Sequence, residues 1–532
     1  MGPPCLLGLD LGTSITKAAL FDPEGHTMAV TSRPSTVISS RAEWSEVDMD
    51  DLWSSVCDAL RDLRARQPDA DIVGMGVCGH VAGVWAIDAQ GRPVRRAILW
   101  NDGRAASILA RWTADGTLAS IFDISGNAIF PGYTVAALAW LQEREPDTLD
   151  RATTIFASKD WIRYRLTGEV ATDESDLSMV PCDARTRTLS RTMLERCGLG
   201  RHASLFPPVA PSTAVVGHVH AEAARMTGLP VGLPVVAGLA DVVASVTGAG
   251  AVTAGHACSI VGTSSLNNVI MDSPEMEPVG IGFLFLNPEG RWMRSLANTA
   301  GTLNLDWFAA NFGAVEAAEA ARRGVDIYQV MAAEAARIPL GADGIIYLPY
   351  LNTTGVTAPF FDPAARAQFF GLSRTHTRAH LVRAVYEGLA LSMLDCYDAL
   401  PAPVYSIALT GGASRSPFWR QMFADCTGRP VTLTDAEETG ARGAALTAGV
   451  GVGLYPDLPS AVAVATRDIV RYDPNPERHA AYRELHGLYR TVAAAMGESW
   501  RRQQETLAHM RALLEHPGHT PVEPHESRRR AT

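Results

Sequence analysis

The spacing of hydrophobic residues alternates along the chain between a strand period and a helix period. Three apolar strands separated by short turns open the sequence, at residues 5–10, 15–21 and 26–32. Residues 48–67 then have helical spacing, with one apolar face made by Leu52, Val56, Leu60 and Leu63. Further strands are predicted at 72–76 and 83–87. A meander followed by alternating helices and strands predicts an α/β domain with a mixed sheet.

The same order of elements begins again in the second half. Strands are predicted at 257–261, 266–270, 281–286, 291–294 and 405–410, and helices at 377–400, 442–450 and 477–515. In each half, a Gly-Thr-Ser turn follows the first strand. We therefore predict two domains of similar architecture, 1–247 and 248–500, with a peripheral helix and a disordered polar tail over 501–532.

Composition narrows the class of protein. With 532 residues, 47% hydrophobic and 19% charged, the chain has the composition of a globular protein with two large domains. The net charge of −11 gives no basic field for nucleic acid or anionic membrane. We find no long apolar run and no signal peptide, and none of the eight cysteines has CxxC spacing. These features predict a cytoplasmic protein with reduced thiols.

The first turn carries candidate phosphate chemistry. A strand delivers Asp10, and Gly12, Thr13 and Ser14 then expose backbone amides and hydroxyls that could cradle phosphate oxygens. The chain has only two lysines, Lys17 and Lys159, and Lys17 could add a positive charge beside this turn. A tight hairpin without any ligand would also explain this turn.

Two further glycine-containing turns lie in the second half. Gly262, Thr263 and Ser264 repeat the chemistry of the first turn, and a pair of such turns is more specific than either alone. The strand at 405–410 ends in a turn that suits a nucleoside packed against backbone, formed by Gly411, Gly412, Ala413 and Ser416. Taken singly, the last motif could equally be a plain strand-to-helix turn.

Carboxylates mark the candidate reaction site. Asp241 interrupts an apolar run of small residues, where an ionised carboxylate is costly unless it is paired or used. Such a group could accept the proton of a sugar hydroxyl, although a helix cap or ion pair is the structural alternative. Asn101 and Asp102 follow a strand and suit hydrogen bonds to a polyol, or a surface turn. His80 and His256 have no second histidine at HxxxH or HxH spacing, so the sequence does not predict a protein-built zinc site.

These motifs, in this order, resemble the FGGY family of carbohydrate kinases within the actin-like ATPase superfamily. Further matching segments are 97–104, 158–161, 166–168, 370–373, 378–380, 386–388 and 437–445. The resemblance implies two actin-like (ribonuclease H-like) ATPase domains with a nucleotide cleft between them, and ATP and Mg²⁺ as cofactors. It implies that Asp241 is the catalytic base and that Asp10 positions Mg²⁺ through water, so that Asp10 and Asp241 are the candidate metal carboxylates. Thr13 and Thr263 would contact the transferred phosphate, the turn from Gly411 to Ser416 would line the adenosine pocket, and Gly301 and Thr302 would approach the nucleotide.

The sequence looks most like the xylulokinase branch of the family, but it departs from that pattern at the predicted sugar site. Xylulokinases typically carry Gln-Met-His-Gly where this chain has His80, Val81, Ala82 and Gly83, and a polar residue where it has Val242. Because unmatched substrate hydroxyls are costly, the sugar preference should change. The loop 130–134, with Tyr133, is a further candidate determinant.

The predicted function is phosphorylation of a primary hydroxyl on a ketopentose, in a protein that could form a homodimer. The alternatives are a short polyol kinase of erythritol or glycerol type, a non-catalytic sugar-sensing regulator, and an actin-like polymer or chaperone.

Overall fold

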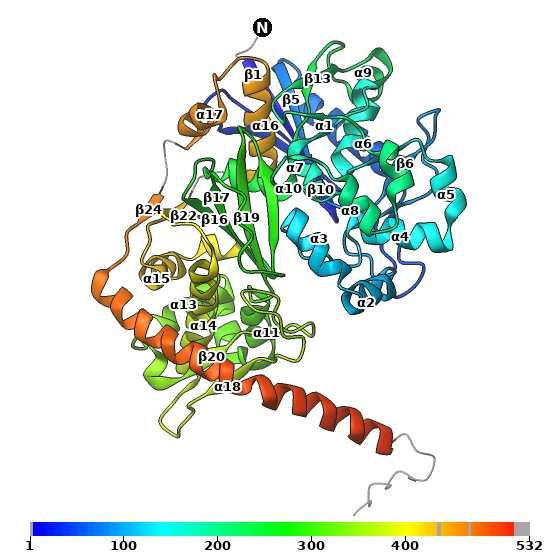
Figure 1. The fold of residues 1–532 in the computed structure, drawn as a ribbon. Coiled ribbons are helices and arrows are strands. Elements are labelled where there is room, and N and C mark those ends of the chain that lie inside the picture. The colour runs from blue at the N-terminus through cyan, green and yellow to red at the C-terminus, as the bar shows by residue number, and fades with distance from the viewer. Residues whose placement is uncertain (1–3, 434–437, 467–469, 515–532) are drawn as a thin grey trace, which may run out of the picture.

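The computed structural model describes residues 4–433, 438–466 and 470–514, which form two mixed sheets with helices around them (Figure 1). The first sheet has the order β13-β14-β5-β1-β2-β3, with β15 also paired to β5. Its strands are β1 (Pro4–Leu11), β2 (Ile15–Phe21), β3 (Thr27–Pro34), β5 (Asp71–Gly79), β13 (Val215–His218), β14 (Pro234–Val236) and β15 (Leu239–Ala240). β1 runs antiparallel to β2 and parallel to β5.

The second sheet repeats this arrangement, with the order β18-β19-β17-β16-β22-β23-β24. Its strands are β16 (His256–Val261), β17 (Ser265–Met271), β18 (Phe283–Asn287), β19 (Arg291–Asn298), β22 (Ser406–Gly411), β23 (Val431–Leu433) and β24 (Val470–Tyr472). β16 runs antiparallel to β17 and parallel to β22, as β1 does to β2 and β5. The duplicated architecture predicted from the sequence is therefore present in the two sheets.

Helices cover both sheets and connect their strands. In the first half they are α1 (Met49–Arg66), α2 (Ala106–Ala114), α3 (Thr117–Ser125), α4 (Thr134–Arg144), α5 (Pro146–Arg151), α6 (Ser158–Thr167), α7 (Glu174–Leu177), α8 (Arg191–Arg196), α9 (Ala221–Thr227) and α10 (Asp241–Gly248). In the second half they are α11 (Leu303–Phe312), α12 (Ala314–Arg323), α13 (Ile327–Ala335), α14 (Arg378–Ala399), α15 (Pro417–Thr427), α16 (Thr439–Gly451), α17 (Leu458–Ala465) and α18 (Pro476–Leu514). Short strand pairs add β4 (Glu46–Val47) with β7 (Ala97–Ile98), β6 (Trp85–Ile87) with β8 (Thr154–Phe156), β9 (Thr172–Asp173) with β12 (Val209–Ala210), β10 (Cys182–Asp183) with β11 (Thr188–Leu189), and β20 (Ile346–Leu348) with β21 (Gln368–Phe370).

Helix α1 shows how local sequence sets an element. The Asp48 side chain accepts the backbone N–H groups of Asp50 and Asp51 and so caps the helix. The apolar face predicted from the sequence is buried against the first sheet. The predicted helix and the observed one agree within a residue or two at each end.

Helix α16 lies in the second half of the sequence but packs on the first sheet beside β1 (Figure 1). A Cβ atom on Gly8 would lie 1.9 Å from the carbonyl oxygen of Ala441, and one on Gly76 would lie 1.9 Å from that of Ala444. Backbone can approach backbone this closely only where side chains are absent. Residues 439–451, which fall in the predicted 248–500 domain, thus complete the core of the first sheet.

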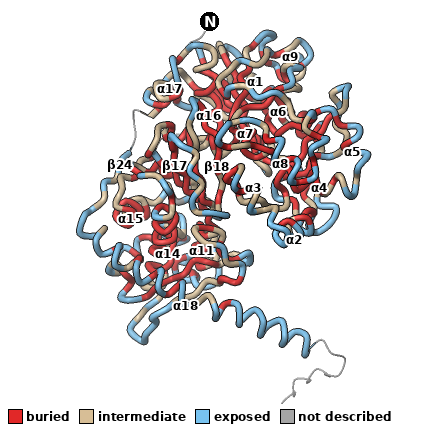
Figure 2. Tube along the Cα trace, viewed as in Figure 1, coloured by how far each residue is buried: buried red, intermediate tan, exposed pale blue. Residues whose placement is uncertain are grey.

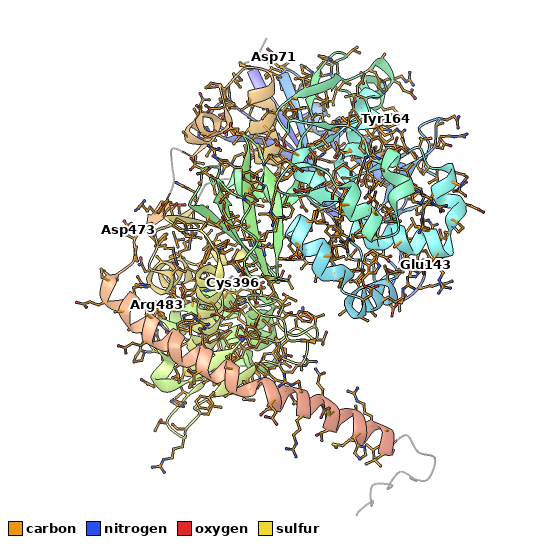
Figure 3. The ribbon with its side chains drawn as sticks, viewed as in Figure 1. Asp71, Glu143, Tyr164, Cys396, Asp473 and Arg483 are labelled. Atoms are coloured by element: carbon orange, nitrogen blue, oxygen red, sulfur yellow. The ribbon has the colours of Figure 1, made fainter. Side chains whose placement is uncertain are left out.

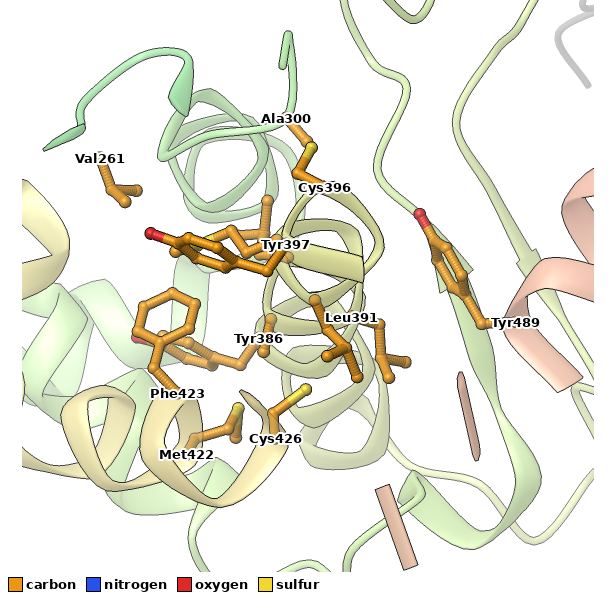
Figure 4. Close-up of a cluster of buried hydrophobic side chains, with 14 of the residues drawn as sticks. Val261, Ala300, Tyr386, Leu391, Cys396, Tyr397, Met422, Phe423, Cys426 and Tyr489 are labelled. Atoms are coloured by element: carbon orange, nitrogen blue, oxygen red, sulfur yellow. The ribbon is translucent and has the colours of Figure 1, made fainter. Parts of the chain in front are cut away.

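The second half has its own large core around α14, and Figure 2 shows buried segments clustered in both halves. Figure 4 shows part of this core, in which Leu391, Cys396 and Tyr397 of α14 pack near Met422 and Phe423 of α15. Figure 3 places Tyr164 in the upper domain and Cys396 in the lower one. All eight cysteines are free and buried, as their spacing predicted.

Helix α18 is peripheral, as predicted, and its residues 501–514 are exposed along their whole length (Figure 2). The predicted tail from residue 515 onward lies outside the described residues. In the described part of the chain, no helix combines the length and apolar character needed to cross a bilayer.

Candidate functional site

Two carboxylates meet where three parallel strands of the first sheet end. Asp10 pairs in register with Cys78 of β5, and Cys78 pairs with Leu239 of β15. Asp241 follows β15 directly and is the first residue of α10. Because parallel strands end at the same edge of a sheet, the fold brings together two residues that are far apart in the sequence.

Burial raises the pKa of both carboxyl groups. The pKa of Asp10 rises to about 6, mainly through burial, partly offset by a hydrogen bond from Cys78 and by the positive charge of Lys17. The pKa of Asp241 rises to about 7, through burial first and then the negative charge of Asp10. Two half-buried carboxyls, of which Asp10 disfavours the charge of Asp241, suit a site that binds a cation and accepts a proton near neutral pH.

The first predicted phosphate turn lies between β1 and β2 and is anchored on both sides. The Gly12 amide donates to the carbonyl of Ile15 (3.1 Å), and the Ser14 carbonyl accepts the Ser35 amide (2.8 Å). The indole nitrogen of Trp100 donates to Thr13 Oγ1 (2.9 Å). Thr13 therefore accepts one bond and keeps its own hydroxyl proton for another partner.

Lys17 has a carboxylate partner from the second half of the chain. Its Nζ lies 2.7 Å from Oε2 of Glu438, the residue before α16. A Cβ atom on Gly440, in the first turn of α16, would lie 2.6 Å from Asp10 Oδ2. In this structure Lys17 makes an ion pair that ties the start of α16 to β2, beside Asp10, and its predicted phosphate contact stays a prediction.

The second predicted phosphate turn, between β16 and β17, is also closed by a backbone hydrogen bond, but it is one residue tighter. The Gly262 amide donates to the carbonyl of Ser264 (2.9 Å), and the Gly262 carbonyl accepts the Thr302 amide (2.7 Å). A Cβ atom on Gly301 would lie 2.4 Å from the carbonyl oxygen of Thr263. Gly301 and Thr302 therefore lie directly against this turn, where the sequence predicted a nucleotide contact.

The paired glycines lie beside the same turn. Gly411 has φ of +82°, and a Cβ there would lie 2.4 Å from the carbonyl oxygen of Val261. A Cβ on Gly412 would contact Thr302 Cγ2 at 3.5 Å. Ala413 lies in the short helical turn Gly412–Arg415, and its side chain is outside the described part. The Ser416 hydroxyl accepts the Trp419 amide (3.4 Å) at the start of α15.

A cavity of about 500 Å³ opens next to these glycines. Its wall includes three residues predicted from the sequence, Thr302, Gly412 and Ser416. It also includes residues that the sequence analysis did not assign to a site, among them Leu305, Asp306, Tyr328, Tyr386 and Phe418. All lining residues lie between 302 and 419, so this cavity belongs to the second half alone rather than to the boundary between the halves.

The cavity has apolar walls and a polar edge. Tyr386 lies edge-on to Phe418 (ring centroids 5.5 Å apart), and Tyr328 donates its hydroxyl to Asp306 Oδ1 (2.6 Å). A flat aromatic ligand with hydrogen-bonding edges suits such a pocket. No sequence signal could have assembled these residues, because they come from α11, α13, α14 and α15.

The predicted sugar loop begins where β5 ends. The His80 amide donates to the Leu11 carbonyl (3.2 Å), and Ala82 and Gly83 both have left-handed backbones, with φ of +60° and +76°. Alanine rarely adopts a left-handed backbone, and the rare cases cluster at functional sites. The ring of His80 packs near that of Trp85. Burial lowers the pKa of His80 to about 4, so its ring is neutral at pH 7. The Val242 amide donates to Asp241 Oδ1 (2.7 Å).

Two predicted sugar contacts have other partners in this structure. Asp102 is buried and accepts from the Ser45 amide, the Arg104 amide and the Arg104 guanidinium, so its oxygens hold a turn. Tyr133 is fully buried and donates its hydroxyl to the Ser178 carbonyl (2.9 Å). Asn101, next to Asp102, is exposed. Asp102 and Tyr133 differ from Asn101 in their burial and their hydrogen-bond partners, and the sequence alone reveals neither property.

Comparison with known proteins assigns the family. The model of the N-terminal domain of the FGGY family of carbohydrate kinases matches residues 5–248, and that of its C-terminal domain matches residues 257–452. This chain belongs to the FGGY family of carbohydrate kinases. It is therefore a sugar kinase, with the two-domain actin-like fold predicted from its sequence.

Relatives with similar sequences act on different sugars. The chain is 30% identical over 503 residues to the L-xylulose/3-keto-L-gulonate kinase of Escherichia coli (92% of this chain, 97% of the relative). It is 30% identical over 505 residues to the erythritol kinase of Brucella abortus (93% and 97%). The crystal structure of xylulose kinase from Rhodospirillum rubrum superposes with a TM-score of 0.83 at 29% identity, covering 93% of this chain and 100% of that one.

Proposed function

We propose that this FGGY kinase transfers the γ-phosphoryl group of ATP to a primary hydroxyl of a ketopentose, with Asp241 as general base. The observation that carries the proposal is the placement of Asp241 and Asp10 together at the carboxyl ends of β15 and β1, beside the Gly12–Ser14 turn. The likeness to an L-xylulose kinase over nearly the whole chain supports a pentulose as the substrate class.

The chemistry assigns a role to each group of residues. Asp241 accepts the proton of the sugar hydroxyl as its oxygen forms a bond to the γ-phosphorus, and the bond from that phosphorus to the ADP oxygen breaks. The turns Gly12–Ser14 and Gly262–Ser264 offer amides and hydroxyls to the phosphates, and the 500 Å³ cavity takes the adenosine. Little covalent chemistry is needed, so alignment should supply most of the rate.

The acidic pair also fits a magnesium ion. Burial and, after it, the negative charge of Asp10 raise the pKa of Asp241, so its ionised form carries an electrostatic cost that a divalent cation would relieve. Mg²⁺ prefers one or two carboxylates together with water and phosphate, a ligand set to which Asp10 and Asp241 could contribute. Bound there by Asp10 and Asp241, Mg²⁺ would neutralise phosphate charge.

A short polyol is the second candidate substrate. Ala82 and Val242 carry no side-chain hydrogen-bonding group, and an equally similar relative is an erythritol kinase. A substrate whose hydroxyls do not reach these two positions would leave none unpaired there. The left-handed backbone of Ala82 fixes the position of its methyl group in the loop.

The test is MgATP consumption by purified protein with L-xylulose, D-xylulose, both ribuloses, erythritol, glycerol and gluconate. A pentulose with the highest kcat/KM supports the proposal, whereas turnover only with erythritol or glycerol replaces the substrate class and keeps the mechanism. On the best substrate, Asp241→Asn should lower kcat by more than ~100-fold with normal folding. Wild-type turnover by this variant would refute the base assignment.

A further inference from the structure

A buried ion cluster is hydrogen-bonded, through two serines, to the segment that leads into Asp241. Lys159 of α6 is fully buried, and its Nζ lies 2.6 Å from Asp160 Oδ1, 3.0 Å from Asp173 Oδ1 and 2.9 Å from Asp176 Oδ2. An ammonium group is compact and can donate to three carboxylates at once, which a planar guanidinium does less well. This geometry gives a physical reason for one of the two lysines in a chain whose other basic residues of this kind are arginines.

The cluster is connected to the reaction site through two serines. Oδ2 of Asp173 accepts the hydroxyls of Ser175 (2.6 Å) and Ser212 (2.8 Å). The Ser175 hydroxyl oxygen in turn accepts the backbone amide of Ala240 (2.8 Å), and the Ser212 carbonyl accepts that of Gly238 (3.0 Å). One carboxylate oxygen thus fixes two serines that hold the chain on either side of Leu239.

The hydrogen bond from the Ala240 amide to the Ser175 hydroxyl fixes the backbone of the residue just before Asp241. On the other side, β15 pairs with β5 through Leu239 with Cys78 and Ala240 with Gly79. Ala240 is fully buried, so its amide would be left unpaired without the Ser175 hydroxyl. The direction in which the chain leaves Ala240 sets the start of α10 and hence the position of the Asp241 carboxylate.

We propose that Ser175, oriented by Asp173 and Lys159, is a positioning residue that holds Asp241 in line with the sugar hydroxyl. The inference rests on the proposed role of Asp241 as general base. Ser175 does not touch the substrate. It acts through the Ala240 amide, so its loss should lower the rate of transfer rather than the affinity for nucleotide, whose pocket is built from residues 302–419.

The test compares Ser175→Ala with Ser190→Ala. Ser190 is also buried, and its hydroxyl also accepts one backbone amide, that of Met193 at the start of α8 (3.2 Å). We expect Ser175→Ala to lower kcat by ~10- to 100-fold with KM for ATP within ~2-fold of wild type, because small misplacements of a reacting group are costly. Ser190→Ala should lose comparable thermal stability and keep its kcat. Equal kcat values for the two variants would overturn the proposal.

Two further variants keep the result decisive. Ser175→Cys keeps the shape of the side chain, with a larger γ atom, but offers a weaker acceptor, so its kcat should fall between those of wild type and Ser175→Ala. If Ser175→Ala does not fold, a wild-type kcat in Ser175→Cys refutes positioning and a lowered kcat with normal KM supports it. Asp241→Asn in the same series separates the two ideas: an active Asp241→Asn refutes the base, whereas an inactive one with a normal Ser175→Ala refutes positioning alone.

Discussion

The indole nitrogen of Trp100 donates a hydrogen bond to the hydroxyl oxygen of Thr13, across 2.9 Å. Trp100 is 42% exposed and follows β7, whereas Thr13 lies in the turn after β1. The bond ties the first predicted phosphate turn to the segment that leads into Asn101 and Asp102. It therefore orients the Thr13 hydroxyl, whose proton remains available for a phosphate oxygen.

Trp100→Phe removes this donor and keeps most of the ring. We expect kcat/KM for ATP to fall by ~3- to 10-fold, because one hydrogen bond contributes about 1 kcal/mol. Thr13→Val should lower it further, since it removes both the acceptor and the phosphate contact. Adding Trp100→Phe to Thr13→Val should cost little more, and steady-state kinetics of the double-mutant cycle would show whether the effects instead add independently.

Gly440→Ala should disrupt the Asp10 site. The added Cβ would lie 2.6 Å from Asp10 Oδ2, so the carboxylate or the start of α16 must move. We expect kcat to fall by at least ~10-fold and the apparent affinity for Mg²⁺ to weaken. Gly487→Ala in α18 is the matched control, because nothing lies within 4 Å of its added Cβ and alanine favours a helix by about 1 kcal/mol. Equal activity of the two variants would contradict this account of the site.

The raised pKa of Asp241 predicts a dependence of activity on pH. The base must be ionised, so kcat at low Mg²⁺ should fall as the pH drops through about 7. Saturating Mg²⁺ should shift this acid limb to lower pH, because a cation favours the carboxylate. A pH–rate profile at two Mg²⁺ concentrations measures the shift, and coincident profiles would exclude a metal beside Asp241.

The same pKa predicts a dependence of stability on pH. The folded-state pKa of Asp241 lies above its ordinary value of 3.8, so its stabilising contribution is present at low pH and is lost as the pH rises through about 7. Asp241→Asn is neutral throughout and should not lose it. Without nucleotide or metal, its Tm should exceed that of wild type by several degrees at pH 8 and match it near pH 4. Asn in place of the exposed Asp69 should leave the pH dependence of Tm unchanged.

Phe418→Ala tests the adenosine pocket. Phe418 lies against Tyr386 in the wall of the 500 Å³ cavity, so its removal should raise KM for ATP by ~10-fold and leave KM for the sugar within ~2-fold. Phe361→Ala removes a phenylalanine that is 67% exposed and does not line this cavity, and it should change neither constant. Parallel rises in both KM values for Phe418→Ala would place the nucleotide elsewhere.

Local sequence was sufficient for the strands that open each half, for a few of the helices and for the order of the chemistry. The two meanders, helix α1, the long α14 and the small-residue helix α16 all follow from hydrophobic spacing, because periods of two and 3.6 residues reflect which face of an element is buried. The turns at Gly12 and Gly262 and the carboxylates Asp10 and Asp241 stand out because such residues interrupt apolar strands. Together, and in their order along the chain, these motifs were specific enough to identify the family.

Only the tertiary structure decided which of these side chains remain available. The sequence predicted that Lys17, Asp102 and Tyr133 contact phosphate or sugar. In the structure, Lys17 pairs with Glu438, Asp102 accepts from Arg104, and Tyr133 donates to the Ser178 carbonyl. The 500 Å³ cavity draws on four helices, and α16 crosses from the second half to pack against Gly8 and Gly76. Local spacing reports the face of an element and not its neighbour, because long-range packing chooses that neighbour. The link from Lys159 through Asp173 and Ser175 to Asp241 exists for the same reason only in the folded protein.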